Sequence, residues 1–186
     1  MLTKGLDIAG VTVVGIIAAD GLLHRSDYSA AEKAFQTMTQ VAGRAGRGDT
    51  PGKVIVQTYS PEHPVIQAVK AHDYHSFSTA ELSERKELNY PPYGNLILIK
   101  LSSIDEGEVQ QAAEKLVDVL TDILSPEYDI LGPAPASVMR VARRYRWQIL
   151  LKFSKNETSL SDLNILSSHL PKSVSMTIDV DPVNMD

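Results

Sequence analysis

Residues 40–47 of the chain, QVAGRAGR, hold one glutamine and two arginines at a spacing suited to binding a charged group. On an α-helix Gln40, Arg44 and Arg47 would share one face, because they are four and three residues apart. Gly43 and Gly46 add no side chain that could obstruct an approaching ligand. Guanidinium groups bind phosphate oxygens through paired hydrogen bonds and stay charged when water is excluded. The pattern therefore predicts contact with a transferring phosphoryl group.

The same segment also allows simpler interpretations. A glycine costs roughly 1 kcal/mol inside a helix. Gly43 and Gly46 within one turn therefore indicate either a close backbone approach or a helix that is about to end. Arginines near the end of a helix also interact favourably with the helix dipole, without any ligand.

The composition restricts what the whole chain can bind. Among 186 residues there are 18 Lys and Arg against 23 Asp and Glu, a net charge of −5, so any contact with nucleic acid needs a local basic patch. Cysteine is absent, which excludes disulfides and thiolate metal sites and fits a reducing cytoplasm. The longest uncharged apolar run, residues 8–19, is shorter than the roughly 20 residues that span a bilayer. No signal peptide is recognisable, and no membrane partner is expected.

The first part of the chain has a strand, helix, strand pattern. Residues 11–19, VTVVGIIAA, form a continuous apolar run that is typical of a strand buried on both faces of a parallel sheet. A helix is expected over residues 30–45, and a second strand over 53–59. Two parallel strands cannot cover their own faces, so this half of an α/β layer is expected to depend on structure outside the chain.

A proline segment, YPPYGN at residues 90–95, marks the boundary between two parts. Two prolines favour extended backbone and stop a preceding helix. That helix is expected over residues 73–88, with Asp73 as its N-cap. Three segments are predicted. The first domain covers residues 1–72, a bridging helix and linker cover 73–94, and the second domain covers 95–186.

The second part has the element order strand, helix, strand, strand, helix, strand, which predicts an α+β, ferredoxin-like βαββαβ domain. Its strands 136–142 and 144–153 are expected to form the central pair. The expected elements are residues 95–103, 106–124, 136–142, 144–153, 159–170 and 173–180. The helix 106–124 is amphipathic, and its core face is predicted to consist of Val109, Ala112, Ala113, Leu116, Leu120 and Ile123.

Alternation along residues 144–153 predicts one apolar and one basic face. Between positions 140 and 155 there are six basic residues and no acidic one, so an acidic chain carries a local basic surface. Such a surface binds anions, or it is a solvated strand edge whose cations prevent aggregation. The side chains expected in the core are Tyr145, Trp147, Ile149, Leu151 and Phe153, and those expected opposite are Arg144, Arg146, Gln148 and Lys152.

The chain also resembles a known family. Residues 40–47 match motif VI, Q-x-x-G-R-x-x-R, of superfamily 2 helicases, and TKGLDI at residues 3–8 resembles their motif V. Over essentially its whole length the chain is similar to the C-terminal part of the bacterial PriA family, the primosomal proteins N′. The matching segments are SDYSAAEKAFQTMTQVAGRAGR, KVIVQTYSPEHP, AELSERKELNYPPYGN, LGPAPA, RYRWQILLKF and TIDVDP. The resemblance implies the end of a RecA-like second helicase lobe, followed by a C-terminal domain.

The resemblance implies a nucleotide site in the first part of the chain. Arg44 and Arg47 match the arginines that face the γ-phosphate of ATP, which such enzymes bind with Mg²⁺, and that stabilise charge in the transition state. Gln40 matches the polar residue of the same motif. Asp20 and Glu32 match acidic positions near this cleft. The residues expected to line the nucleotide cleft beside these are Gly5, Asp7 and Gly43.

Two positions depart from the family pattern. The family often has an acidic residue where Ala18 stands and an arginine where Ser29 stands. These departures bear on the local salt-bridge network of the cleft and not on the two arginines. The family also has zinc-binding cysteines, which this chain lacks.

For the second part, the resemblance implies binding to replication forks and to partners. Arg144 and Gln148 match positions that receive the acidic C-terminal tail of single-stranded DNA-binding protein, and an arginine with an amide suits a terminal carboxylate. Other primosome proteins are further expected partners. The residues expected to contact DNA phosphates are Arg140, Arg143, Arg146 and Lys152.

The function expected from these features is that of the C-terminal part of an ATP-dependent 3′ to 5′ DNA helicase that recognises stalled forks and initiates primosome assembly. The chain contains no G-x-x-x-x-G-K-[ST] phosphate loop and no D-E-x-H segment, so it is expected to hydrolyse no ATP by itself. The alternatives are a stand-alone, non-catalytic module that binds nucleic acid or the acidic tail, and a piece of a different superfamily 2 translocase.

Overall fold

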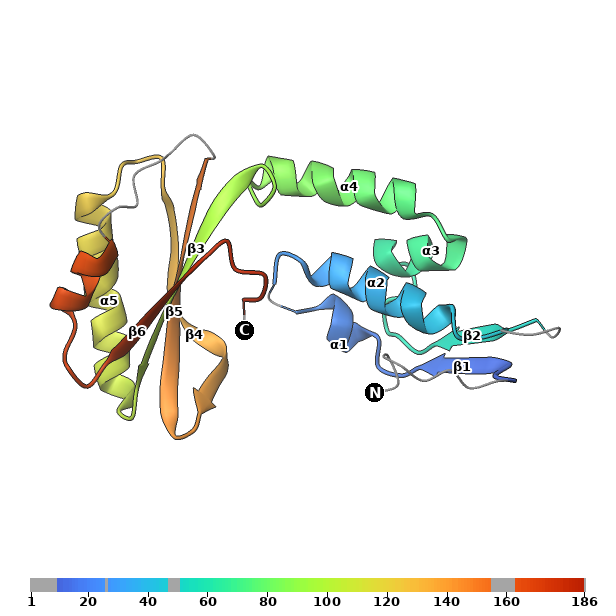
Figure 1. Cartoon of the computed structure of the whole chain (residues 1–186), viewed down its shortest axis with the longest axis horizontal. Helices are drawn as coiled ribbons and strands as arrows, with labels where there is room; N and C mark the ends of the chain where they lie inside the picture. The colour runs from blue at the N-terminus through green and yellow to red at the C-terminus, as the bar shows by residue number, and fades with distance from the viewer. Residues whose placement is uncertain (1–9, 26, 47–50, 155–162, 186) are drawn as a thin grey trace. The chain divides into compact units, whose positions relative to one another are not determined.

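A small parallel sheet and a larger antiparallel sheet lie in different parts of the chain (Figure 1). The computed structural model describes residues 10–25, 27–46, 51–154 and 163–185. The chain divides into two units, Met1–Ser83 and Glu84–Asp186. The chain is therefore a mixed α/β protein. Within the described ranges, no helix combines the length and the apolar character needed to cross a bilayer.

In the first unit the two strands pair in parallel. β1 (Val13–Ile16) lies beside β2 (Lys53–Val56), with Val13 opposite Lys53. The connection between them contains α1 (Asp20–Leu23) and α2 (Ala30–Ala42), and α3 (Pro64–Ala71) follows β2. The predicted strand, helix, strand order is confirmed. The two short helices α1 and α3 were not predicted, because each has too few residues to show a clear helical period.

The core of the first unit forms around α2. The helical spacing predicts one apolar stripe along α2, of which Ala34, Phe35 and Met38 are buried, whereas Val41 and Ala42 are only half-buried. The ring of Phe35 stacks on that of Phe77, with centroids 4.3 Å apart. Val65 of α3 belongs to the same cluster. The apolar face of α2 therefore packs against the helices that follow β2.

The two-stranded sheet leaves alternate side chains exposed. Val13 and Ile55 are 57% and 52% exposed, whereas Val14 and Val56 are half-buried. Burial of residues 11–19 on both faces is therefore not seen within this chain, whereas the expectation that two parallel strands cannot cover their own faces is met. A continuous apolar run shows that both faces tolerate burial, but it does not supply a second layer to cover them.

A buried carboxylate anchors the start of α2. Asp27 accepts hydrogen bonds from the backbone N–H and the hydroxyl of Ser29, and its Oδ2 lies 2.6 Å from Nζ of Lys33. Burial alone would raise the pKa of Asp27, but the hydrogen bonds from Lys33 and Ser29 outweigh it and the pKa lies below its usual value. Ser29 thus takes part in the contacts that begin α2.

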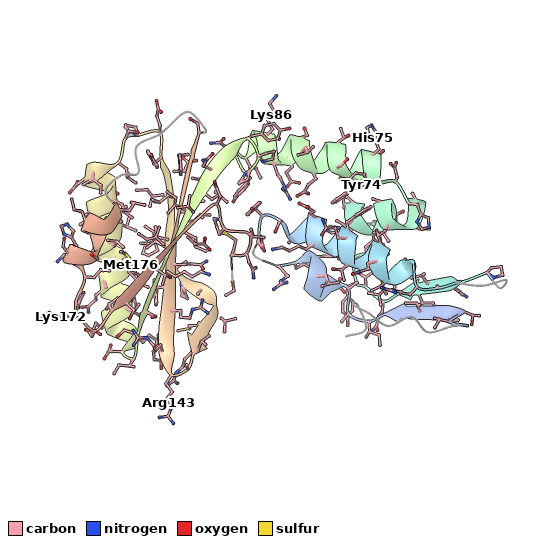
Figure 2. All side chains as sticks on the ribbon, in the orientation of Figure 1. Tyr74, His75, Lys86, Arg143, Lys172 and Met176 are labelled. Carbon is pink, nitrogen blue, oxygen red and sulfur yellow. The ribbon has the colours of Figure 1, made fainter. Side chains whose placement is uncertain are left out.

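The helix α4 (Tyr74–Glu87) contains the division between the two units. Asp73 caps it as predicted, because its Oδ1 accepts a 2.9 Å hydrogen bond from the N–H of Ser76. Most side chains of α4 are exposed, and His75 and Lys86 point outward (Figure 2).

The second unit is a four-stranded antiparallel sheet with one long helix on a single face (Figure 1). Its strands lie in the order β4-β5-β3-β6, so the predicted central hairpin is wrong: β5 is central, but β4 lies at the edge beside it. The expected helix at 159–170 is also wrong in type, because its described part is a 3-10 helix. The elements are β3 (Gly94–Ser103), α5 (Glu106–Ile123), β4 (Asp129–Val141), β5 (Arg144–Ser154), η1 (Leu163–His169) and β6 (Ser175–Val180).

The core of this unit lies between the sheet and α5. Ile149, Leu151 and Phe153 of β5 are buried there, as alternation predicts, and Tyr145 and Trp147 pack against them. The helix residues Val109, Ala112, Ala113, Leu116 and Leu120 are buried as predicted. Ile123 is 53% exposed and is not a core residue, because α5 ends there and the chain turns away.

Candidate functional site

The helix α2 ends just before the first arginine of the QVAGRAGR segment. Gly43 is its C-cap residue, and the N–H groups of Arg44 and Ala45 donate to the carbonyls three residues earlier, each at 3.1 Å. This spacing is that of a tight turn rather than an α-helix. The helix predicted over 30–45 is therefore too long, and Arg44 lies on the turn that follows Gln40.

Gly46 lets two stretches of backbone pass closely. Its φ is +73°, and its N–H donates a 3.0 Å hydrogen bond to the carbonyl of Val11 before β1. A Cβ at Gly46 would lie 2.6 Å from the backbone nitrogen of Gly52, and a Cβ at Gly52 would lie 2.3 Å from that of Gly46. The sequence indicated that a backbone passes close to these glycines. At Gly46 that backbone is the chain's own segment at Gly52.

The structure brings Gln40 and Arg44 to the same end of α2. Gln40 and Gly43 are exposed, and Arg44 is half-buried. Three predicted residues, Gly5, Asp7 and Arg47, lie outside the described residues. A guanidinium and an exposed amide at the end of a helix are groups that fit phosphate oxygens.

The described residues of this unit offer no evident set of ligands for a metal ion. Across the described residues, no three His, Cys, Asp or Glu side chains gather in a way that could hold a metal ion. The carboxylates near α2 have other contacts. Asp20 accepts hydrogen bonds from the hydroxyl of Thr58 and the N–H of Tyr59, and Glu32 accepts one from Gln36.

The pKa of Asp20 follows from these contacts. Removal from water would raise it, but the hydrogen bonds from Thr58 and Tyr59 outweigh that effect and the pKa lies below its usual value. The carboxylate therefore ties the start of α1 to the segment after β2. Asp20 follows β1, and Thr58 and Tyr59 follow β2, so these hydrogen bonds hold together the two segments that leave the carboxyl ends of the parallel strands.

The second candidate site is the face of the sheet opposite α5. Register places Arg146 opposite Ser102, and Gln148 opposite Lys100, on the central strand β3. Because Ile149 and Leu151 point to the helix side, the alternate positions of β5 point to the other side. The predicted sharing of one face by Arg144, Arg146, Gln148 and Lys152 is therefore confirmed.

Arg144 has a structural role at the end of this sheet. Its guanidinium donates to the carbonyl of Ser102 at 2.5 Å, to the hydroxyl of Ser175 at 3.0 Å and to the carbonyl of Ser173 at 3.4 Å. The side chain thus reaches from β5 across the end of β3 to β6. Within the described residues the printed hydrogen bonds of this guanidinium come from Nε and Nη2, and the residue as a whole is half-buried.

Glu108 is joined to the same end of the sheet. It accepts hydrogen bonds from the hydroxyls of Ser173 and Ser103, and these bonds lower its pKa. Sequence reasoning did not single out this residue. The D-x-x-E pattern of Asp105 and Glu108 is the sequence feature that could have indicated it. It marks the start of α5, where Asp105 accepts a hydrogen bond from the N–H of Glu108.

The cations of the β4–β5 hairpin differ in accessibility. Lys152 is 14% exposed in its side chain, lies 3.4 Å from Asp129 and sits over the ring of Tyr90. Arg140 lies over the ring of Tyr145, with its Cζ 4.8 Å from the centroid. Arg143 is exposed at the end of the hairpin and points away from the sheet (Figure 2). The aromatic supports of Lys152 and Arg140 were not predicted.

Two polar atoms of β5 are buried without a partner among the described residues. They are Oε1 of Gln148 and Nε1 of Trp147. Trp147 packs against the core, as its parity predicts. A buried oxygen without a donor costs free energy, so Gln148 is a candidate for contact with a ligand N–H group.

Comparison with known proteins indicates the family of the chain. Residues 86–183 match the family model of the primosomal protein N C-terminal domain. Over the whole chain, 52% of residues are identical to the replication restart protein PriA of Synechocystis sp., 42% to that of Bacillus subtilis and 38% to that of Treponema pallidum. The chain covers 22%, 24% and 28% of these relatives, about a quarter of their length. The chain therefore belongs to the PriA family of replication restart proteins and corresponds to their C-terminal portion.

Proposed function

We propose that the chain acts as the C-terminal part of an ATP-dependent 3′ to 5′ DNA helicase that recognises stalled replication forks and initiates primosome assembly. The observation that carries this proposal is identity over the whole chain to replication restart proteins from three organisms. The position of Gln40 and Arg44 together at the end of α2 supports it.

In this proposal the first unit is the end of a RecA-like helicase lobe. Arg44 and Arg47 contact the γ-phosphate of ATP and stabilise the charge that develops as the phosphoryl group is transferred. Gln40 orients that contact. ATP supplies the transferable phosphoryl group, and Mg²⁺ and most of the nucleotide are held by other parts of the helicase. The residues proposed to contact the nucleotide beside these are Gly5, Asp7 and Gly43, of which Gly5 and Asp7 lie outside the described residues.

We further infer that the second unit is a ferredoxin-like domain that binds DNA. The strand order β4-β5-β3-β6 and the helix on one face support this assignment, with the second helix reduced to η1. The basic face opposite α5 supplies charge for phosphate contacts. The cations proposed for this role are Arg140, Arg143, Arg146 and Lys152.

Arg146 tests the phosphate contacts. Arg146→Ala is expected to weaken binding of the 186-residue chain to duplex, single-stranded and forked DNA alike, because all three present phosphates, whose contacts do not depend on the sequence. The slope of log affinity against log salt should fall by about one. Lys152→Ala should have a smaller effect, since Lys152 already pairs with Asp129. Fluorescence anisotropy over a salt series measures both quantities.

Lys172, an exposed lysine after η1, provides the control (Figure 2). Lys172→Ala removes one charge from the same unit but not from the basic face, and it should leave the salt slope unchanged. An Arg146→Ala slope equal to that of the unsubstituted chain would show that Arg146 touches no phosphate.

A second proposed ligand of this unit is the acidic C-terminal tail of single-stranded DNA-binding protein. Arg144 and Gln148 are four residues apart on β5, a distance of about 13 Å along a strand. They would therefore hold different parts of the tail. Nη1 of Arg144 would bind a carboxylate, and the buried Oε1 of Gln148 would accept from a peptide N–H group.

Gln148→Ala is expected to reduce affinity for an acidic peptide with a free C-terminus by roughly fivefold to tenfold, the value of one buried hydrogen bond. Isothermal titration calorimetry with the 186-residue chain measures it. Gln110→Ala on the exposed face of α5 is the matched control. Equal affinities for the Gln148→Ala and Gln110→Ala variants would rule out the tail site on this face.

A further inference from the structure

The edge strand β4 departs from regular pairing near its end. Pro135 pairs with Trp147 and Arg140 pairs with Tyr145, so residues 136–139 of β4 face the single residue Arg146 of β5. Extra residues in one strand form a bulge that redirects side chains. The bulge leaves Val138 50% exposed and Met139 38% exposed.

The turn that follows is tight and unusual in composition. Val141 pairs with Arg144, so the hairpin closes through Ala142 and Arg143, whose φ angles are +49° and +65°. Two-residue turns of this kind favour glycine or asparagine, because other side chains are strained at positive φ. Here the turn instead carries an arginine that points away from the sheet (Figure 2).

The exposed end of the hairpin therefore carries both aliphatic and cationic side chains. Val141 is 45% exposed, and Val138 and Met139 of the same strand are also exposed. Arg140 is supported by the ring of Tyr145, and Arg143 lies at the turn itself. This group of five residues is called the hairpin tip below: Val138, Met139, Arg140, Val141 and Arg143.

Charge indicates a polyanionic ligand for the hairpin tip. Residues 130–154 contain five Arg and Lys and no Asp or Glu, within a chain whose net charge is −5. Arg144 and Lys152 are engaged in contacts within the unit. The other two cations next to the turn of this hairpin are Arg140 and Arg143.

The shape of the tip favours nucleic acid over a peptide. A peptide that adds to a sheet edge needs a continuous row of backbone partners, and the bulge interrupts that row on β4. A two-stranded ribbon fits into a nucleic-acid groove. Exposed aliphatic side chains gain little from phosphates, but they bind favourably to the faces of bases that are no longer stacked.

We propose that the hairpin tip inserts where the two strands of a DNA duplex separate. Arg140 and Arg143 contact phosphates on either side, and Val138, Met139 and Val141 lie against the first unpaired bases. This inference rests on the proposed DNA binding of the second unit, and it adds contact with bases to contact with phosphates.

The test replaces the three aliphatic residues by serine in the 186-residue chain, which alters no charge. Anisotropy is measured with an intact duplex, a single strand and a forked duplex of equal length. The triple variant should bind the fork about tenfold more weakly, because it loses the burial of apolar side chains. Its affinity for the intact duplex and its salt slope should not change. Arg143→Ala, in contrast, should weaken binding to all three DNAs by a similar factor.

Val180→Ser on β6 is the control, since Val180 is an equally exposed valine on the opposite edge strand. Thermal unfolding of each variant checks that the fold is intact. A triple variant that keeps the preference of the unsubstituted chain for the fork overturns the inference and leaves the proposed function standing. Absence of any DNA binding by the unsubstituted chain overturns both. A loss confined to binding of an acidic peptide would make the tip a peptide surface and would overturn the inference.

Discussion

On the proposed function, replacing Arg44 by alanine in the full-length protein is expected to lower the kcat of DNA-stimulated ATP hydrolysis by about a thousandfold or more, the usual effect of losing an arginine that stabilises phosphoryl transfer. The KM for ATP should change little, because this contact strengthens in the transition state. Arg44→Lys should recover only a small part of the activity, since lysine keeps the charge but not the planar pair of donors. Steady-state kinetics at saturating DNA measure both constants.

Two controls separate this role from a structural one. Arg25→Ala removes an exposed arginine from the same unit and should leave kcat unchanged. The 186-residue chain by itself should show no hydrolysis above background, because its sequence has no phosphate loop. If Arg44→Ala and Arg25→Ala have equal kcat, the arginine of this turn does not act on the nucleotide.

Gly52→Ala is expected to destabilise the first unit by about 3 kcal/mol, at the upper end of the cost of overpacking. The new Cβ would lie 2.3 Å from the nitrogen of Gly46 and 2.4 Å from the carbonyl carbon of Ala45, and backbone atoms cannot yield as a flexible side chain can. The two segments would have to separate. The hydrogen bonds from Gly46 to Val11 and from Lys53 to Thr12 would then weaken.

Gly15→Ala is the matched control, because a Cβ at Gly15 of β1 would meet nothing within 4 Å. It should be neutral or slightly stabilising, as alanine lowers the entropy of the unfolded chain. Trp147 is the one tryptophan of the sequence and lies in the second unit. The midpoint of urea unfolding followed by circular dichroism should therefore fall for Gly52→Ala. The midpoint of the transition followed by Trp147 fluorescence should stay the same. Equal stabilities of the two glycine variants would contradict the prediction.

Local periodicity in the sequence was sufficient to predict which face of each long helix or strand is buried. The buried positions of α5 up to Leu120, the core side of β5 and the cap at Asp73 all followed from spacing along the chain. Side-chain direction repeats every 3.6 residues in a helix and every two in a strand, whatever the rest of the protein does. The resemblance of the QVAGRAGR segment and of the segments after it also lay in the sequence alone, and it indicated the family.

Contacts between distant segments decided the rest. Gly46 meets Gly52 and Val11, and Arg144 bonds to Ser102, Ser173 and Ser175, none of which spacing along one element could predict. The end of α2, the edge position of β4 and its bulge also depend on such contacts. The sequence by itself determined which face of each long element is apolar, because that is a property of the local backbone period. The tertiary structure decided which groups meet, because a backbone crossing or a hydrogen bond across strands has its energy only when both segments are in place.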